Sequence, residues 1–249
     1  KFIFIKTEEK ENEKTGKIEV KESVIFPRYH QLDAVRKLLA DVEENRTSLN
    51  YLIQHSAGSG KTNTIAWLAY RLATLHDADN KIIFDNVIIM TDRVVVDRQL
   101  QKAIMSMEHK SGLIRVMDEK CNSADLAIAL NGNTKIIATT IQKFPYIVDS
   151  VQGLKNKRFA VIIDEAHSST AGKDMAAVTQ SLGMGDELYQ DMEDGIAAEL
   201  ARNGKQQNVS MFAFTATPKP TTLQLFGTLN TNGQREAFHV IILMNKAVR

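Results

Sequence analysis

From Arg28 onward, short apolar runs bounded by turn residues alternate with stretches of helical periodicity. The apolar runs are LNYLI (49–53), NVIIM (86–90), LIRVM (113–117), KIIAT (135–139), FAVII (159–163) and VSMFAF (209–214). A strand that is apolar at every position is buried on both faces, as happens in a parallel sheet covered by helices. The pattern therefore predicts one α/β domain in three layers with a mainly parallel central sheet, in which VSMFAF is the last core strand.

Helical periodicity separates these runs. The segment KTNTIAWLAYRLATL (61–75) is amphipathic at the helical period, and an earlier segment carries apolar residues at helical spacing. These earlier residues are Leu32, Val35, Leu38, Leu39 and Val42. Both segments predict helices that cover the sheet.

The two polar regions of the chain are interpreted separately. Residues 1–25 hold six lysines and six glutamates around FIFI and GKIEVKESVIF, which predicts a short β hairpin or arm that leads from an upstream domain. We interpret Glu19 and Lys21 in this arm as a solvated strand face. Residues 183–208 are polar and partly helical, and we interpret them as an insertion within a domain that spans residues 26–249.

Composition narrows the class of protein. The 249 residues are 43% hydrophobic, which is enough to form a hydrophobic core. The net charge is +1, so the protein as a whole has no strong positive charge that would attract a polyanion. Any contact with nucleic acid must come from a local basic patch. Cys121 is the only cysteine, which excludes an intrachain disulfide. No run reaches the roughly 18 apolar residues of a membrane span, and we expect a cytoplasmic protein without a membrane partner.

The most specific motif is QHSAGSGKTNTI (54–65), which lies between a predicted strand and a predicted helix. Glycine-rich turns in this context cradle phosphate with backbone N–H groups at a helix N-terminus. We name residues 56–62 the phosphate loop. Its predicted nucleotide-binding residues are Ala57, Gly58, Ser59, Gly60, Lys61 and Thr62. Lys61 would reach the outer phosphates and Thr62 would hold Mg²⁺, whereas the alternative is a glycine-rich turn with a solvated lysine.

A second motif, FAVIIDEAH (159–167), supplies the acidic partner that a phosphate loop needs. Asp164 and Glu165 follow an apolar strand, and ligands of open α/β sheets bind beyond the carboxyl ends of the strands. We predict that Asp164 holds Mg²⁺, that Glu165 orients or deprotonates the attacking water, and that His167 couples the site to a distant one. The alternative is a solvated turn. The motif is a poor match to a zinc site, because DEAH lacks a second histidine four residues later.

In this order, SAGSGKT, DEAH and FTATP (214–218) look like motifs I, II and III of superfamily 2 helicases and translocases. The resemblance implies a RecA-like P-loop NTPase lobe that uses ATP and Mg²⁺. The segment FPRYHQLDAV (26–35) resembles the adenine-recognition segment of that superfamily. Gln31 would then pair with the adenine edge, and Arg28 or Tyr29 would stack on the base. The alternative for this segment is a helix start with one buried aromatic residue.

Two further segments narrow the resemblance. IIMTDRVVVDRQL (88–100) and ATTIQKF (138–144) look like motifs Ia and Ib of the motor subunit of type I restriction endonucleases. This likeness implies an ATP-driven translocase of double-stranded DNA, in a complex with modification (methyltransferase) and specificity subunits. By motif position, the candidate DNA contacts are Thr91, Arg93, Thr139, Thr140, Gln142 and Lys143. The alternative for each is a surface polar residue at a strand end.

The TAT sequence of the third motif suggests a coupling role. Thr215 and Thr217 would link the ATP site to DNA or to a second lobe, and the alternative is helix capping before Pro218. Motors of this kind close two lobes around one ATP, yet the chain ends soon after TATPK (215–219). We therefore expect the first lobe of a longer subunit, without the nuclease core and the second lobe. Loss of the second lobe's arginines would reduce turnover by about 10³ or more.

Two other functions stay open at this stage. One is a different superfamily 2 motor that acts in DNA repair or on RNA. The other is a non-hydrolysing nucleotide-binding module that docks onto a partner through residues 183–208. The joint presence of Lys61, Asp164 and Glu165 argues against this last alternative, because a degenerate ATPase has no need of all three.

Overall fold

The protein is described here from a computed structural model. The structure describes residues 3–11, 18–46, 49–91, 98–106, 112–117, 121, 123–140, 143, 146–147, 150, 154–164 and 207–241. The predicted insertion at 183–208 lies outside these residues except for its last two positions. Within the described residues, no helix is long and apolar enough to cross a membrane.

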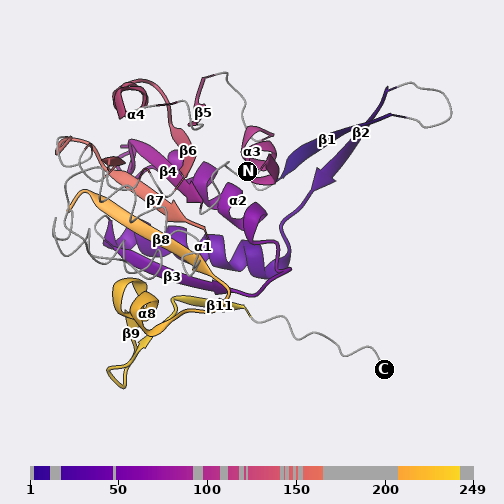
Figure 1. The fold of residues 1–249 in the computed structure, drawn as a ribbon. Coiled ribbons are helices and arrows are strands. Elements are labelled where there is room, and N and C mark those ends of the chain that lie inside the picture. Colours follow the sequence, from indigo (N-terminus) through magenta and orange to yellow (C-terminus); the bar gives the residue numbers. More distant parts are fainter. Residues whose placement is uncertain are drawn as a thin grey trace, which may run out of the picture.

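A parallel sheet of seven strands forms the centre of the molecule, in the spatial order β11-β3-β8-β7-β4-β6-β5 (Figure 1). Its strands are β3 (Asn50–His55), β4 (Asn86–Thr91), β5 (Ile114–Val116), β6 (Ile136–Thr140), β7 (Phe159–Ile163), β8 (Val209–Thr215) and β11 (His239–Ile241). Each neighbouring pair is parallel. The predicted α/β architecture with a mainly parallel sheet is therefore confirmed.

Helices cover both faces of the sheet. They are α1 (Tyr29–Asn45), α2 (Lys61–Ala73), α3 (Arg98–Met105), α4 (Ser123–Asn131) and α8 (Pro220–Phe226). Side chains of α1, α2 and α3 belong to one buried cluster, and side chains of α4 and α8 belong to a second. Alternate residues of strands such as β4, β7 and β8 supply the two clusters, because successive side chains of a strand lie on opposite faces.

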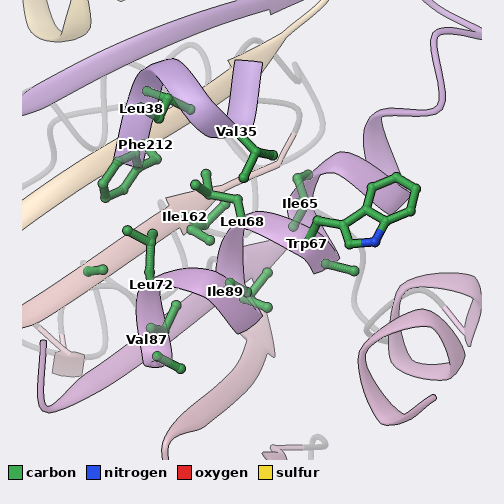
Figure 2. Packing of buried hydrophobic residues seen from close by; sticks show 14 of the residues in the cluster. Val35, Leu38, Ile65, Trp67, Leu68, Leu72, Val87, Ile89, Ile162 and Phe212 are labelled. Carbon is green, nitrogen blue, oxygen red and sulfur yellow. The ribbon is translucent and has the colours of Figure 1, made fainter. Parts of the chain in front are cut away.

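The first cluster is the larger one and lies behind the phosphate loop. Figure 2 shows side chains of α1 and α2 meeting those of β4, β7 and β8. Leu68 of α2 is fully buried there, and the rings of Tyr51 and Phe212 stack with centroids 4.9 Å apart. This packing holds α2, and with it the first turn that carries Lys61, against the sheet.

The N-terminal arm forms the expected hairpin. β1 (Phe4–Glu11) pairs in antiparallel register with β2 (Ile18–Ile25), and the hairpin extends away from the sheet (Figure 1). Glu19 and Lys21 lie in β2, opposite Lys10 and Glu8.

One expectation about the sheet is wrong, because VSMFAF does not form the last core strand. After β8 and α8, a small antiparallel pair of β9 (Thr228–Leu229) and β10 (Arg235–Glu236) leads into β11, which pairs with β3 at one edge of the sheet. An apolar run, VIILM (240–244), does follow His239 in the sequence, but the six runs used to predict the sheet do not include it. The position of β11 is decided by the pairing with β3, which local sequence does not show.

Candidate nucleotide-binding site

The phosphate loop and the acidic motif meet at one end of the sheet. The loop follows the carboxyl end of β3, and Asp164 follows the carboxyl end of β7, with only β8 between these strands. Lys61 Nζ lies 3.9 Å from Asp164 Oδ1, and both side chains are largely buried, with 11% and 17% exposed. The convergence expected from the sequence is therefore present.

Two glycines give the loop its shape. Gly58 has φ of 78° and Gly60 has φ of 81°, both in the left-handed region that residues with a Cβ atom adopt at a cost. Between them, the N–H of Ser59 donates to the carbonyl of Ser56 at 3.2 Å and closes a turn. The Ser59 hydroxyl is buried and has no hydrogen-bond partner among the described residues. A buried donor of this kind fits a loop built to surround an anion.

Helix α1 holds the loop from the outside. His30 Nε2 donates to the carbonyl oxygen of Ser59 at 2.9 Å, and Gln31 Nε2 donates to that of Gly60, also at 2.9 Å. In a trans peptide the N–H points opposite to the carbonyl. The N–H groups of Gly60 and Lys61 therefore point away from α1, as a phosphate cradle at the start of α2 requires.

Gln31 is engaged at both atoms of its amide. Its Oε1 accepts a hydrogen bond from the N–H of Arg28 at 2.8 Å, and the side chain is only 3% exposed. Each atom of the amide keeps one further hydrogen-bonding position. By contrast, Tyr29 is 84% exposed and Phe26 is 63% exposed. Phe26 is an aromatic residue beside the predicted base site that the sequence analysis did not select.

The main chain of Asp164 is hydrogen-bonded to the neighbouring strand of the sheet. Its N–H donates to the carbonyl of Met90 at 2.8 Å, so the ladder between β7 and β4 continues through this residue. Thr62 is the second residue of α2, on the same side of the sheet end. A carboxylate and a hydroxyl are ligands suited to Mg²⁺. Glu165 and His167 lie outside the described residues.

The candidate coupling residues lie at the end of β8, which separates the two motifs. Thr215 is fully buried and pairs in register with Gln54 of β3. Its hydroxyl accepts a hydrogen bond of 3.3 Å from the N–H of Thr217, an exposed residue. Thr215 is thus placed between the strand that carries the phosphate loop and the strand that carries Asp164.

The candidate DNA contacts gather at the same end of neighbouring strands. Thr91 of β4 is in register with Thr140 of β6, and Thr139 lies on the opposite face. These three threonines are nearly or fully buried, at 3%, 7% and 0% exposed for Thr91, Thr140 and Thr139. Lys143 donates through Nζ to the carbonyl of Cys121 at 2.6 Å. Arg93 and Gln142 lie outside the described residues.

A buried histidine pair lies beside the loop and is not apparent from the sequence. His55, the last residue of β3, is fully buried, and its Nε2 lies 3.2 Å from His239 Nδ1 of β11. Burial, together with the nearby His239, His30 and Lys61, lowers the pKa of His55 to about 3. The two histidines are 184 positions apart, so spacing along the chain carries no signal of their contact.

Comparison with known proteins agrees with this geometry. The profile of the SWI2/SNF2 ATPase family matches residues 30–236. A Mycoplasma pneumoniae protein, described as the C-terminal part of the type I restriction enzyme MpnIIP endonuclease subunit, is 31% identical over 162 residues. That match covers 59% of this chain and 73% of the relative. The endonuclease subunit of type I restriction enzyme SsaAORF53P from Staphylococcus saprophyticus is 31% identical over 150 residues.

A solved structure supports the fold. The ATP-dependent Type ISP restriction-modification enzyme LlaBIII, solved bound to DNA, aligns with a TM-score of 0.53 and 19% identity. The alignment covers 83% of this chain and 13% of that one. The central sheet thus has the fold of a RecA-like lobe.

The chain belongs to the SWI2/SNF2 ATPase family and to the family of type I restriction enzyme endonuclease subunits. Family and fold together imply that the loop is a nucleotide site. The chain spans only 15% of the length of the Staphylococcus saprophyticus subunit.

Proposed function

We propose that residues 26–249 form the first motor lobe of a type I restriction enzyme subunit, which hydrolyses ATP to translocate double-stranded DNA before cleavage. The observation that carries this proposal is the 3.9 Å approach of Lys61 Nζ to Asp164 Oδ1 beside the left-handed turns of the phosphate loop. A cation that reaches phosphates and a carboxylate that holds a metal are needed at one point in P-loop ATPases.

Each residue of the site has a distinct part in this proposal. The N–H groups of residues 57–62 surround the phosphates, and Lys61 neutralises the outer ones. Thr62 and Asp164 would hold Mg²⁺, which would supply positive charge that offsets the charge of the phosphates. Glu165 orients or deprotonates the attacking water. Since phosphoryl transfer depends mainly on positioning and electrostatics, these residues must be held still before ATP arrives.

The base would lie at the N-terminus of α1. Tyr29 is exposed enough to stack on an adenine ring, and Arg28 offers a planar cation for the same purpose. Gln31 would use its remaining donor and acceptor positions on the adenine edge while it holds the carbonyl of Gly60. The Gln31 amide would then contact both the base and the phosphate loop, and so link binding of the base to the position of the loop.

DNA would bind across the carboxyl ends of β4 and β6. The residues proposed for this contact are Arg93, Gln142 and Lys143, together with Thr91, Thr139 and Thr140, whose side chains are buried in this structure and would have to be uncovered for DNA to reach them. Hydroxyls, amides and cations at phosphates fix position without reading sequence, which suits a motor that steps along any DNA. Thr215, Thr217 and His167 would couple this edge to the ATP site. In the cytoplasm, the subunit would act with modification and specificity subunits.

Calorimetric titration with a non-hydrolysable ATP analogue tests the proposal. Wild-type protein is expected to bind the analogue more tightly with Mg²⁺ than without it, and Lys61→Ala is expected to abolish binding. Lys102→Ala removes an exposed cation of α3 and is the matched control, with binding unchanged. Equal binding by Lys61→Ala and wild-type protein would refute the proposal. DNA-stimulated ATP turnover by the full-length subunit tests the translocase assignment separately.

A further inference from the structure

Three residues from three elements form a continuous hydrogen-bonded chain behind the phosphate loop. Asp33 Oδ2 of α1 lies 3.0 Å from His239 Nε2 of β11, and His239 Nδ1 lies 3.2 Å from His55 Nε2 of β3. His239 is 6% exposed and His55 is fully buried. At the outer end, the ammonium of Lys37 contacts the same oxygen of Asp33 at 2.9 Å.

The chain has a preferred direction of donation. The carboxylate of Asp33 can only accept, because Lys37 and His239 hold the pKa of that group below its usual value. His239 therefore carries hydrogen on Nε2, and its Nδ1 is placed to accept from the Nε2–H of His55. His55 Nδ1 is then a bare acceptor, and it is buried without a hydrogen-bond partner in the part of the chain that the structure describes. The reverse direction would leave a buried N–H unpaired instead, which native proteins tolerate less often.

The surroundings of His55 favour this uncharged form. Its ring packs edge to face on Phe214 with centroids 5.9 Å apart, and on His30 with centroids 6.3 Å apart. The charged or titratable neighbours, His30 of α1, His239 of β11 and Lys61 of α2, all disfavour a positive charge on His55. A neutral His55 leaves Lys61 as the cation at the loop.

Strand β11 also reaches the loop through its main chain. The carbonyl of Ile241 accepts a hydrogen bond of 3.0 Å from the N–H of Ser56, the first residue of the phosphate loop. The loop is thus held on one side by His30 and Gln31 of α1 and on the other by β11. The residue just before it, His55, is held by the chain of side chains.

We propose that Asp33 and His239 are positioning residues for nucleotide binding, which hold His55 as the Nε2–H tautomer and thereby set the junction between β3 and the phosphate loop. This inference rests on the proposed nucleotide site. Asp33 and His239 touch neither phosphate nor metal. They act through His55, so that α1, β11 and the loop move as one unit.

Nitrogen-15 NMR of the histidine rings tests the first half of the proposal without any nucleotide. In the wild-type chain, both His55 and His239 are expected to show protonated Nε2 and unprotonated Nδ1 at neutral pH. Asp33→Asn is expected to change the tautomer of His239, because an amide can donate as well as accept. Protonated Nδ1 on His239 in the wild-type chain would overturn the proposal, whatever the variants do.

Binding of a non-hydrolysable ATP analogue tests the second half. Asp33→Asn and His239→Leu are each expected to raise Kd about tenfold, the effect of one lost charge-assisted or buried hydrogen bond. Lys37→Met is the matched control, because it removes the ion pair on the solvent side of Asp33 and leaves His239 in contact. Its Kd and its ring spectra are expected to match those of wild-type protein.

The two levels of failure are distinguishable. If wild-type protein binds the analogue and Asp33→Asn binds it equally well, the positioning role is wrong and the nucleotide site stands. If wild-type protein does not bind the analogue, the proposed function fails while the tautomer measurement still decides the hydrogen-bonded chain. If His239→Leu does not fold, Asp33→Asn and the wild-type spectrum still decide both questions.

Discussion

The side chain of Gln31 and the main chain of Gly60 are joined by a 2.9 Å hydrogen bond, which ties the first turn of α1 to the start of α2. The same contact explains why position 60 is a glycine. A Cβ atom at this position would lie 2.6 Å from Gln31 Nε2, whereas one at Gly58 would meet no atom of the described residues within 4 Å. Both glycines have positive φ, but only position 60 has the steric conflict. Comparing alanine substitutions at the two positions therefore separates the cost of backbone strain from the cost of the clash.

Gly58→Ala is expected to lower the free energy of unfolding by about 1 kcal/mol, the cost of a left-handed alanine. Gly60→Ala is expected to cost about 1–2 kcal/mol more, since Gln31 must give up hydrogen bonds to Gly60 and Arg28. Urea unfolding followed by fluorescence of Trp67, the only tryptophan, measures both. Adding Gln31→Ala should recover part of the loss at position 60 and none at position 58. Equal costs for the two glycine variants would contradict this account.

Asp164→Asn is expected to abolish the Mg²⁺ dependence of nucleotide binding, because the neutral amide lacks the negative charge of the carboxylates through which proteins bind Mg²⁺. Binding without Mg²⁺ should persist or improve, since a negative charge near the phosphates has been removed. Titration of an ATP analogue with and without Mg²⁺ measures this. Asp125→Asn on α4 is the control and should behave as wild type. Retention of the full Mg²⁺ effect in Asp164→Asn would exclude Asp164 as a metal ligand.

The pKa of His55, lowered to about 3 from an ordinary value near 6.5, makes stability depend on pH. Between these values the unfolded chain binds a proton that the folded chain does not. Stability must therefore fall as pH falls from about 6.5 toward 3, by up to about 1.4 kcal/mol per pH unit. His55→Gln should remove this part of the slope, and His76→Gln, at an exposed position, should not. Identical slopes in wild-type protein and His55→Gln would show that His55 is not held neutral.

Tyr51 predicts the opposite dependence at high pH. Burial, and the hydrogen bond of 2.7 Å that its hydroxyl donates to Asp41 Oδ2, raise its pKa well above the ordinary value near 10. Above about pH 10 the unfolded chain loses a proton that the folded chain keeps, so stability falls as pH rises. Tyr51→Phe should cost about 1 kcal/mol at pH 8 and reduce the alkaline loss. Urea unfolding from pH 8 to 11 measures both effects, with Tyr70→Phe as control.

Leu68 of α2 packs between the helix and the sheet with no exposed surface (Figure 2). Leu68→Ala is expected to lower the free energy of unfolding by about 2–5 kcal/mol, through lost burial and the cavity left behind. Ile128→Ala on α4 removes a side chain that is 64% exposed and should change stability by less than about 0.5 kcal/mol. Similar costs at the two positions would show that α2 does not pack as described.

Local sequence was enough to locate most of the sheet. Apolar runs such as FAVII and VSMFAF predicted strands within one residue of β7 and β8, because a strand buried on both faces needs apolar side chains at every position. The same reasoning missed β11. The apolar run VIILM (240–244) is compatible with a strand but does not show its place in the sheet, which depends on pairing with β3 far earlier in the chain.

The functional site, like the sheet, has a part that could be predicted from the sequence and a part that could not. From residue order alone, the glycines, Lys61 and Asp164 could be assigned to one site, because strand ends of a parallel sheet share an edge. Sequence determined which segments become strands and helices and where phosphate would be bound, since these depend on neighbours along the chain. Only the tertiary structure decided that Gln31 holds Gly60 and that Asp33, His239 and His55 form one chain. Those contacts join residues 29 to 206 positions apart, and only folding brings such residues together.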